Sequence, residues 1–476
     1  MSRLLVRDRE FYRTFFRLTC IIALQNVLVY VVNLADNVMI GTYSETSMSG
    51  VALVNQVQFM LQMLVNGAGE GMIVMASRYW GERDIPKIHR TVAIGMGMGL
   101  LFAVLMWGLV FFFPMPVLRL LTPEEPVLAE AAIYLRIVCF SYVFFAVTQL
   151  LLASMRSVET TGVGFIVSLV ALFVNIILNY ALIFGKLGCP EMGVAGAAWA
   201  TLIARIVETA VTVFYVRGID RKLRLRLSHF FRIDRTLLGH YLRYGSPVIL
   251  SSGVWGIGMA AQTAILGHMG AASIAANSIA TTAFNMLTVV TYGSASASSV
   301  ITGKTIGEGR YDAVRQYAKT FQILFLCIGL VTGTLIFLLR GVIVGMYNIS
   351  GESAALARSF MTVLSVTVVG TSYQMACLTG IVRGGGDTRF VLYNDMIFMW
   401  GIVLPLTALA AFVLHWPPVV VFACLKSDQI TKCAVAVVKV NRFRWIRQFE
   451  APKSVKSTGS AEIAEPTEIA EPAEKE

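Results

Sequence analysis

The sequence predicts an all-α integral membrane protein, with twelve transmembrane helices in two six-helix bundles related by a pseudo-two-fold axis along the membrane normal. Composition is the first observation. Hydrophobic residues make up 56% of the 476 positions and charged residues only 14%, and the mean hydropathy is +0.70. A soluble domain of this length cannot bury so much apolar surface. Long apolar runs are the second observation, since a helix needs about 20 apolar residues to cross the hydrocarbon core.

An internal repeat is the third observation. Residues 36–90, moved by 226 positions, fall on residues 262–316 without a gap. The matched positions are Gly41 with Gly267, Gly67 with Gly293, Gly81-Glu82 with Gly307-Glu308 and, with one further residue of offset, Arg156 with Arg383 and Thr161 with Thr388. Two copies of one apolar unit in a membrane make two similar bundles with a cleft between them, a plan common among secondary transporters.

Each copy supplies six expected spans. Their apolar runs are continuous rather than alternating, which favours helices over a closed strand barrel. The first copy is expected to span the membrane at roughly 14–38, 50–76, 91–113, 131–154, 163–184 and 194–216. The second is expected to do so at roughly 246–267, 277–302, 318–339, 357–381, 390–413 and 417–438.

Basic residues give the orientation, because Lys and Arg accumulate in cytoplasmic segments. They gather before span 1, between spans 2 and 3, between spans 6 and 7 and after span 12, all on one side if there are twelve spans. The loops at 42–49 and 268–276, on the other side, contain no Lys or Arg. Both termini are therefore predicted to be cytoplasmic.

These boundaries define the predicted organisation. It comprises a cytoplasmic amino terminus at 1–13, an amino-terminal bundle at 14–216, a basic cytoplasmic connector at 217–245, a carboxy-terminal bundle at 246–438 and a cytoplasmic tail at 439–476. The connector alternates Leu with Arg around residues 223–227, which predicts an amphipathic segment at the inner headgroup surface. A calmodulin-like partner is the alternative use of such a segment. The tail repeats EIAEP and is predicted to be disordered from about 451.

The net charge of +11 and a pI near 9.4 raise the alternative of nucleic-acid binding. We reject it, because the basic residues lie at span ends, facing an anionic leaflet. The seven cysteines are scattered, mostly inside spans, so no disulfide framework is expected. No cleavable signal peptide is predicted, because the first apolar run has no small-residue cleavage site.

Ionisable side chains inside spans are costly and mark functional candidates. Three carboxylates qualify: Asp36 in span 1, Glu70 in span 2 and Asp395 in span 11. Arg205 and Glu208, at i and i+3 in span 6, are expected to pair with each other. Asp36 has no basic neighbour in its own span, so it needs a proton, a metal ion or a distant Arg.

Oxygen-bearing side chains in spans 5 and 6 suit such an ion. Asn175 and Asn179 lie at i and i+4, so both amides point the same way. With Thr201 and Asp36 they make a set of hard oxygen ligands of the kind that alkali cations need. Interhelical hydrogen bonding is the alternative role of the two Asn residues.

The second copy does not reproduce these charges. Asp36 corresponds to Gln262 and Glu70 to Ser296, so an ion is expected in the first half. The chain has no Walker-type phosphate loop and no HExxH. The glycine-rich segment GGGDT at 384–388 is predicted to form a tight turn. Asp387 is expected to be a helix cap or an ion-pair partner of Arg383 or Arg389. We therefore expect no enzyme, no catalytic residue and no cofactor, and an ion gradient as the energy source.

The motifs together resemble the multidrug and toxic compound extrusion (MATE) family over roughly residues 10–450. They are ADNVMIG in span 1, the Gly81-Glu82 turn, NIILNYALIFG and MGVAGAAWAT in spans 5 and 6, and VRGGGDTRF before span 11. The resemblance implies two six-helix bundles around a central cleft, and export of amphipathic organic cations against Na⁺ or H⁺. It also implies a location in a bacterial-type inner membrane, where we expect a monomer in contact with lipid.

The resemblance also implies site residues. By motif, Asp36, Asn175, Asn179 and Thr201 match the family's cation-coupling positions, which hold Na⁺ if the coupling ion is sodium. Asp387 matches an acidic residue that NorM-like members use in the second bundle, while Glu70 and Asp395 are further acidic candidates. NorM-like members place a Glu eight residues after the Pro of span 7, where this chain has Trp255. That departure resembles the DinF-like branch.

The leading hypothesis is therefore cation-coupled antiport of small amphipathic molecules by alternating access. Two alternatives stay open at this point. A lipid-linked saccharide flippase would keep the fold and need basic residues in its cavity for a pyrophosphate. A membrane scaffold or receptor would keep the helices without transport.

Overall fold

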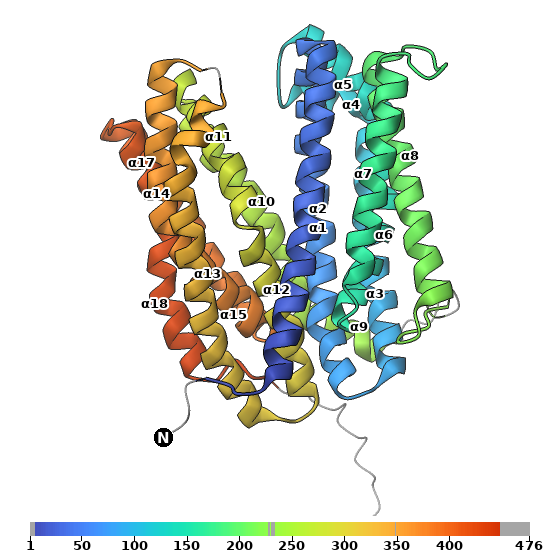
Figure 1. Ribbon diagram of the computed structural model, residues 1–476, viewed down its shortest axis with the longest axis vertical. Helices are drawn as coiled ribbons and strands as arrows, with labels where there is room; N and C mark the ends of the chain where they lie inside the picture. Colours follow the sequence, from blue (N-terminus) through green and yellow to red (C-terminus); the bar gives the residue numbers. More distant parts are fainter. Residues whose placement is uncertain (1–4, 227–228, 230–233, 348, 448–476) are drawn as a thin grey trace, which may run out of the picture.

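The computed structural model describes residues 5–226, 229, 234–347 and 349–447. Within them the chain forms helices and loops and contains no strand, so the predicted all-α membrane fold is confirmed. Figure 1 shows the helices in two groups that stand side by side, α1–α8 in one and α10–α18 in the other. The predicted disordered tail lies outside the described residues.

The first group contains α1 (Arg9–Tyr43), α2 (Glu45–Gly81), α3 (Ile85–Phe112), the short α4 (Pro114–Arg119), α5 (Glu125–Val138), α6 (Ser141–Ser157), α7 (Gly162–Ile183) and α8 (Gly193–Phe214), which a π-helical turn η1 (Tyr215–Ile219) extends. The connector then forms α9 (Arg235–Tyr244). The loop that holds residues 223–226 keeps the predicted alternation: Leu223 and Leu225 are buried while Arg224 and Arg226 are exposed.

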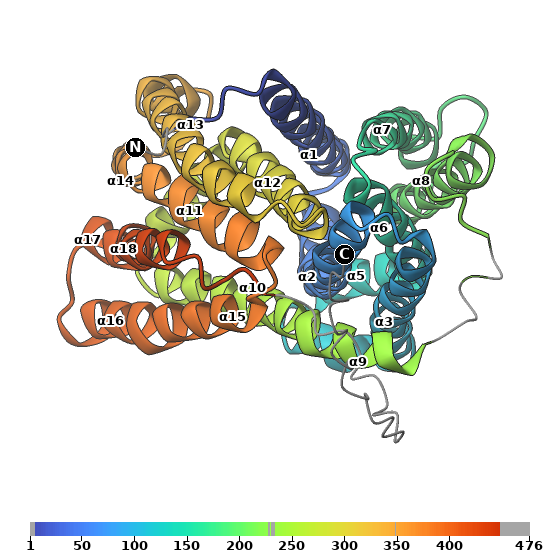
Figure 2. The ribbon, with the colours of Figure 1, turned by 90° about the horizontal axis from the view of Figure 1, so that it is seen from below.

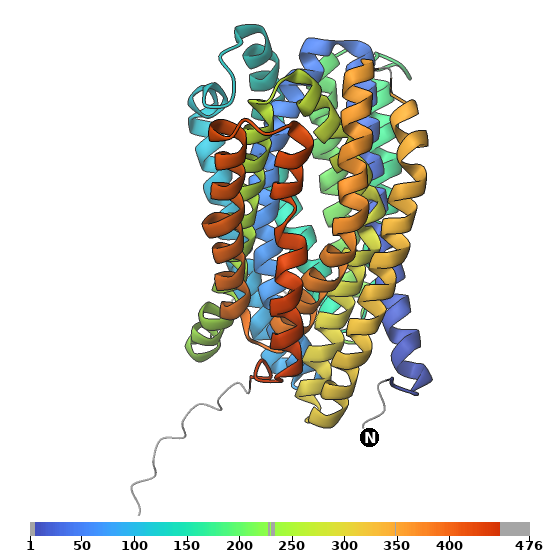
Figure 3. The same ribbon diagram turned by 90° about the vertical axis from the view of Figure 1, so that its left-hand side faces the viewer.

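The second group contains α10 (Ser246–Gly267), α11 (Ala271–Leu287), α12 (Val289–Gly307), α13 (Tyr311–Gly345), α14 (Gly351–Met375) with η3 (Ala376–Val382), α15 (Thr388–Met396) with η4 (Ile397–Val403), α16 (Leu404–Ala408) with η5 (Leu409–Val413), α17 (Pro418–Leu425) and α18 (Asp428–Asn441). Helix α18 packs against both α14 and η4, as the face in Figure 3 shows.

Nine helices among the described residues are long and apolar enough to cross a membrane, and two bent pairs raise the number to eleven. The pairs are α5 with α6, bent by 55°, and α11 with α12, bent by 45°. They occupy the expected fourth and eighth spans. The expected twelfth span coincides with α17 and α18, which are separated by Lys426 and Ser427. Each of the twelve predicted spans thus falls on a helix or on a broken run of helices.

Hydroxyl groups accompany both bends. Ser141 donates its hydroxyl to the carbonyl of Val138 at 2.6 Å, between α5 and α6. Thr288, between α11 and α12, donates to the carbonyl of Phe284 at 2.7 Å. A side-chain hydroxyl that bonds to a nearby carbonyl competes with the helical ladder and bends the helix. The apolar periodicity continues through both positions, which is why the sequence predicts straight spans there.

The two groups meet on the side of the molecule where the beginning of α1 and α9 lie (Figure 1). Helix α2 packs against α10 and α12, and α1 packs against α12; Figure 2 shows α2 and α12 near the centre from that side. The tightest approach uses repeat-related glycines: a Cβ on Gly81 would collide with the carbonyl of Lys304, and one on Gly307 with that of Arg78. Only glycine allows the two backbones to come so close.

Helix α1 belongs to both groups. Its first turns carry Phe11 and Phe15, which pack against Tyr317, Phe321 and Phe325 of α13. Farther along, α1 packs against α7 of the first group. The predicted boundary places residues 14–216 in the first bundle, but the beginning of α1 is part of the apolar core of the second.

Candidate functional site

The carboxylate of Asp36 is held between α1 and α7. Helix α7 is apolar except for a few side chains, and Asn175 and Asn179 lie one turn apart on the face that meets α1. Asn179 donates its Nδ2 to Asp36 Oδ1 and also to Asn175 Oδ1, the latter at 3.2 Å. Both amides are buried. One amide nitrogen therefore lies between two oxygen atoms from different helices, and the hydrogen bonding expected of the two Asn residues is present.

Thr201 joins the same site through a cavity. Asp36, Asn175 and Thr201 line a space in the first bundle, together with Tyr134 of α5. Water-sized molecules can occupy about 60 Å³ of it. That is enough for a small cation with a few waters and too little for a drug-sized molecule. The structure thus brings the four predicted cation-coupling residues together.

The neighbouring charges leave Asp36 without an ion pair among the described residues. Arg205 Nη1 lies 2.7 Å from Glu208 Oε2, so the predicted pairing within α8 is present. Asp36, Arg205 and Glu208 all line the cavity, and two carboxylates against one guanidinium leave one formal negative charge. A buried carboxylate without a counter-ion is unstable in a membrane unless a proton or a cation neutralises it.

Glu70 lies apart from this site. Its Oε1 is 3.7 Å from Arg156 Nη1 of α6. Both line a second cavity, between the two bundles, with room for about 350 Å³. We call it the central cavity. Residues of α1, α2, α6, α12 and η3 contribute to its wall.

Asp387 does not approach the other predicted residues. It occupies the cap position of α15 without a capping hydrogen bond from its side chain. Its oxygens lie 2.7 Å from Lys439 Nζ and 3.5 Å from Arg447 Nη2. The expected partners were Arg383 or Arg389. The cations that Asp387 meets follow span 12, and sequence spacing gives no information on so distant a contact.

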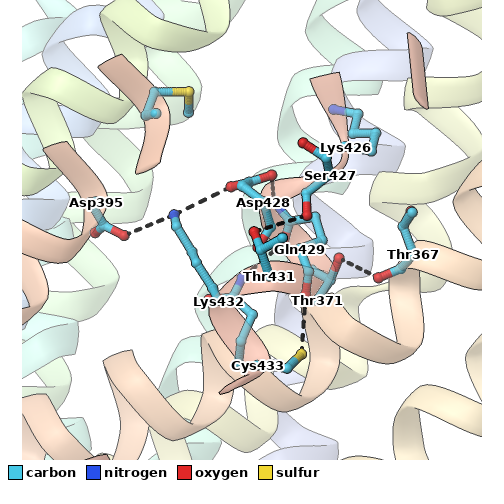
Figure 4. Close-up of polar contacts among 12 residues, drawn as sticks. Thr367, Thr371, Asp395, Lys426, Ser427, Asp428, Gln429, Thr431, Lys432 and Cys433 are labelled. Atoms are coloured by element: carbon cyan, nitrogen blue, oxygen red, sulfur yellow. Dashed lines mark hydrogen bonds and ion pairs between the residues drawn. The ribbon is translucent and has the colours of Figure 1, made fainter. Parts of the chain in front are cut away.

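Asp395 belongs to an ionic cluster in the second bundle (Figure 4). The carboxylate of Asp395 lies 3.2 Å from Lys432 Nζ, and the same Nζ lies 3.3 Å from the carboxylate of Asp428. Asp395 also accepts a hydrogen bond from the hydroxyl of Ser251 at 2.8 Å. The cluster lines a third cavity, with room for about 310 Å³. Sequence reasoning singled out Asp395 but missed Asp428 and Lys432. Their spacing of four residues inside the predicted span 417–438 was the available signal.

The three cavities differ in size and in the side chains of their walls, and therefore in the ligands that they suit. The small one presents oxygens and a negative balance, which suits a cation. The central and third cavities are large enough for part of an organic molecule, and the third has Trp255 and several Met side chains in its wall. No group of three or more His, Cys, Asp or Glu in the described part of the chain has the arrangement of a metal centre. The oxygens around Asp36 instead come mostly from amides and a hydroxyl.

Comparison with known proteins places these features in a family. The model of the MatE family matches residues 22–181 and 247–409. The chain is 24% identical over 406 residues to the uncharacterized transporter YisQ of Bacillus subtilis, covering 84% of this chain and 88% of that protein. It is 28% identical over 378 residues to the probable multidrug resistance protein NorM of Rhizobium meliloti, covering 78% and 80%.

Solved structures show the same fold. A variant of the Vibrio cholerae MATE transporter VcmN superposes with a TM-score of 0.81 at 18% sequence identity, covering 90% of this chain and 96% of that one.

Proposed function

Because this chain belongs to the MATE family, whose members are transporters and not enzymes, we propose that it exports small amphipathic molecules in exchange for Na⁺ or H⁺ by alternating access. One observation carries the coupling part of the proposal. Asp36 lies inside a membrane span, bonded to an amide and free of any ion pair among the described residues. Such a group binds and releases a cation at low cost in rearrangement.

The amide of Asn179 can serve both states of the site, with and without a bound cation. In the structure its Nδ2 lies between Asp36 Oδ1 and Asn175 Oδ1, and Asn179 Oδ1 has no hydrogen-bond partner among the described residues. A rotation of this amide turns its oxygen toward Asp36 and presents carbonyl and carboxylate oxygens to a cation, with Thr201 on the same cavity. Sodium ligation then replaces the hydrogen bonds. With H⁺ as the coupling ion, the proton resides on Asp36 itself.

Alternating access would use the contact between α2 and α12. Gly81 and Gly307 let the helices touch, and Lys304 Nζ reaches across to Glu159 at 2.9 Å. These contacts close one side of the molecule. We assign that side to the cytoplasm, because basic residues gather there. Opening it requires the two bundles to separate at the glycines.

Helix α1 is the proposed link between ion and movement. It carries Asp36 against α7, and its first turns are anchored on α13 of the other bundle. An ion can drive the change only if it binds the two states with different affinity. A shift of α1 relative to α7 would change the distance from Asp36 to the two amides, and hence that affinity.

The remaining assignments are also proposals. The named relatives include multidrug resistance proteins, which favours drug-like cargo over the flippase and scaffold alternatives. We place the chain in the plasma membrane as a monomer in contact with lipid, with both termini cytoplasmic. Trp255 stands in the wall of the third cavity, where the resemblance expects Glu in NorM-like members. It supports a place in the DinF-like branch.

The test is ion-driven uptake of a fluorescent organic cation into inverted vesicles, which corresponds to efflux from the cell, with Asp36→Asn. We expect ion-driven efflux to disappear, because the neutral amide neither binds a proton nor attracts Na⁺. Asp312→Asn is the matched control, since that carboxylate is fully exposed. Wild-type efflux by Asp36→Asn would remove Asp36 from the mechanism.

A further inference from the structure

The internal repeat contains an arginine whose partner has been replaced. In the first copy, Glu70 of α2 pairs with Arg156 of α6 at 3.7 Å. The corresponding residues of the second copy are Ser296 of α12 and Arg383, at the end of η3. The repeat therefore keeps the guanidinium and substitutes a hydroxyl for the carboxylate.

Among the described residues, neither Arg383 nor Ser296 has a side-chain hydrogen bond or an ion pair. Arg383 is only 8% exposed, and its guanidinium forms no hydrogen bond or ion pair among the described residues, with Nε buried and unsatisfied. The hydroxyl of Ser296 is likewise buried without a hydrogen-bond partner. A buried guanidinium without a counter-ion is costly, so the arrangement favours an anionic occupant.

The two groups face the same space. Arg383 and Ser296 both line the central cavity, in which about 350 Å³ is available. Three guanidinium groups and one carboxylate lie in its wall, from Arg156, Arg205, Arg383 and Glu70. Arg156 is paired with Glu70, and Arg205 with Glu208. Of these three guanidinium groups, that of Arg383 is the one without an ion pair among the described residues.

The two carboxylates whose charges act on Arg383, Glu70 and Asp395, are already engaged with other cations. Arg383 also lines the third cavity, which Asp395 shares. Asp395, however, pairs with Lys432 at 3.2 Å and accepts a hydrogen bond from Ser251. The second bundle therefore offers Arg383 no spare carboxylate among the described residues.

We propose that Arg383 and Ser296 form a subsite that binds a carboxylate carried by the transported molecule. The guanidinium fork matches a carboxylate with two parallel hydrogen bonds, and the serine hydroxyl can donate a third. The occupant thus takes the place that Glu70 holds in the first copy. The inference rests on the proposed transport function and specifies which residues of this chain hold a carboxylate-bearing substrate.

A matched pair of dyes tests it. Rhodamine B carries a free carboxylate, and its methyl ester carries none while keeping the same cationic ring system. Binding of each to the purified full chain is measured by fluorescence anisotropy at neutral pH. We expect the wild type to bind the acid about tenfold more tightly than the ester, because charge-assisted hydrogen bonds to the carboxylate are lost in the ester.

Two variants test whether the preference for the acid over the ester depends on Arg383 and Ser296. Arg383→Gln removes the cation, and acid and ester should then bind alike. Ser296→Glu places a carboxylate in the chain itself, where it pairs with Arg383 and displaces the dye's carboxylate, so the preference should again disappear. Arg340→Gln is the control, since that side chain lies on α13 against Phe337, and it should keep the wild-type ratio. Monodispersity and thermal unfolding check that each variant is folded.

The outcomes separate this inference from the proposed function. A wild type without preference, or a preference that survives in Arg383→Gln or Ser296→Glu, overturns the carboxylate site. Ion-driven efflux of the ester, measured separately in vesicles, tests antiport. Loss of efflux together with an intact acid preference would refute coupling and leave the carboxylate site standing.

Discussion

At the residue scale, the molecule is distinguished by how its buried charges are compensated. Most of those described are paired, such as Arg205 with Glu208 and Lys304 with Glu159. Asp36, which is partly buried, and Arg383 are two exceptions, and the two proposals depend on them. A charge that stays unpaired in a membrane span is costly unless a ligand neutralises it. The exceptions therefore mark where an ion and a substrate are expected to bind.

Asn179→Leu tests the amide beside Asp36. The variant keeps the branching at Cγ but removes the donor to Asp36 and the carbonyl proposed as an ion ligand. We expect the ion concentration needed for half-maximal efflux to rise by about tenfold or more, because a hydrogen bond to a charged group is worth about 1.5–3 kcal/mol. Efflux from vesicles, recorded over a range of Na⁺ and H⁺ concentrations, measures this half-maximal concentration.

Asn441→Leu is the control for that experiment, since Asn441 ends α18 and contacts Gln322. An unchanged ion dependence in Asn179→Leu would show that the amide takes no part in coupling.

Lys432→Met tests the ionic cluster of the second bundle. The change leaves Asp395 and Asp428 without their shared cation, and the side chain of Asp428 is only 4% exposed. Removal of one partner from a buried ion pair costs about 3–5 kcal/mol. Thermal unfolding of the purified protein should therefore shift to clearly lower temperature.

A triple variant provides the matched comparison. Asp395→Asn and Asp428→Asn, added to Lys432→Met, remove both orphaned charges and should recover most of the stability. If Lys432→Met alone unfolds like the wild type, the cluster has no structural role.

At the element scale, breaks and caps shape the bundles more than helical propensity does. Continuous apolar runs place every predicted span on a helix or on a broken run of helices, because the membrane requires long apolar segments. They do not reveal the bends between α5 and α6 or between α11 and α12, which accompany single hydroxyl-to-carbonyl bonds. They also miss α4, a six-residue helix that begins at Pro114 outside the spans.

Asp234→Ala tests the start of α9 in the connector. The side chain of Asp234 accepts from the amides of Thr236 and Leu237 and pairs with Arg90 at 2.8 Å. Burial alone would raise its pKa, but these hydrogen bonds and the guanidinium hold the pKa of Asp234 below its usual range. The contribution of Asp234 to the free energy of unfolding is therefore present above the pKa that Asp234 has in the unfolded chain. It is lost as the pH falls through the lower pKa of the folded protein.

The expected cost at neutral pH is about 1 kcal/mol, which is typical for loss of a helix cap. The stability difference between Asp234→Ala and the wild type, measured by denaturation at several pH values, should narrow toward zero in acid. A difference that stays constant across the acidic range would contradict the assigned role of the carboxylate.

At the scale of the whole molecule, the repeat explains both the architecture and its asymmetry. The matched glycines place Gly81 and Gly307 where α2 and α12 touch. Divergence between the copies then gives them different chemistry: Asp36 faces amides in the first bundle, while the second has a Lys–Asp cluster. A comparison of the two copies predicts an ion site in the first half. It cannot predict the cluster, which joins α15 to α18 across long sequence separations.

The sequence also predicts the grouping of Asp36, Asn175, Asn179 and Thr201, through residue type, helical spacing and resemblance. It does not predict that the first turns of α1 pack on α13. That packing depends on how the two bundles are arranged, which one-dimensional periodicity does not contain. The contacts of Asp387 with Lys439 and Arg447 were inaccessible for the same reason.

A cross-link between the bundles tests alternating access. A Cβ on Gly303 would lie 3.2 Å from Ser77 Cβ, close to the separation that a disulfide requires. In a background without the native cysteines, Ser77→Cys with Gly303→Cys should oxidise, stop efflux and recover it on reduction. Each single substitution is the control. Full transport by the oxidised pair would show that this contact does not open during the cycle.

The most direct test of the role of Asp36 is counter-movement of the ion itself. Proteoliposomes that contain the full chain are given a substrate gradient, and entry of radioactive Na⁺ and internal pH are recorded together. The wild type should move one of the two ions against substrate, and Asp36→Asn should move neither. Ion counterflow in Asp36→Asn at the wild-type rate would contradict the claim that this carboxylate carries the coupling ion.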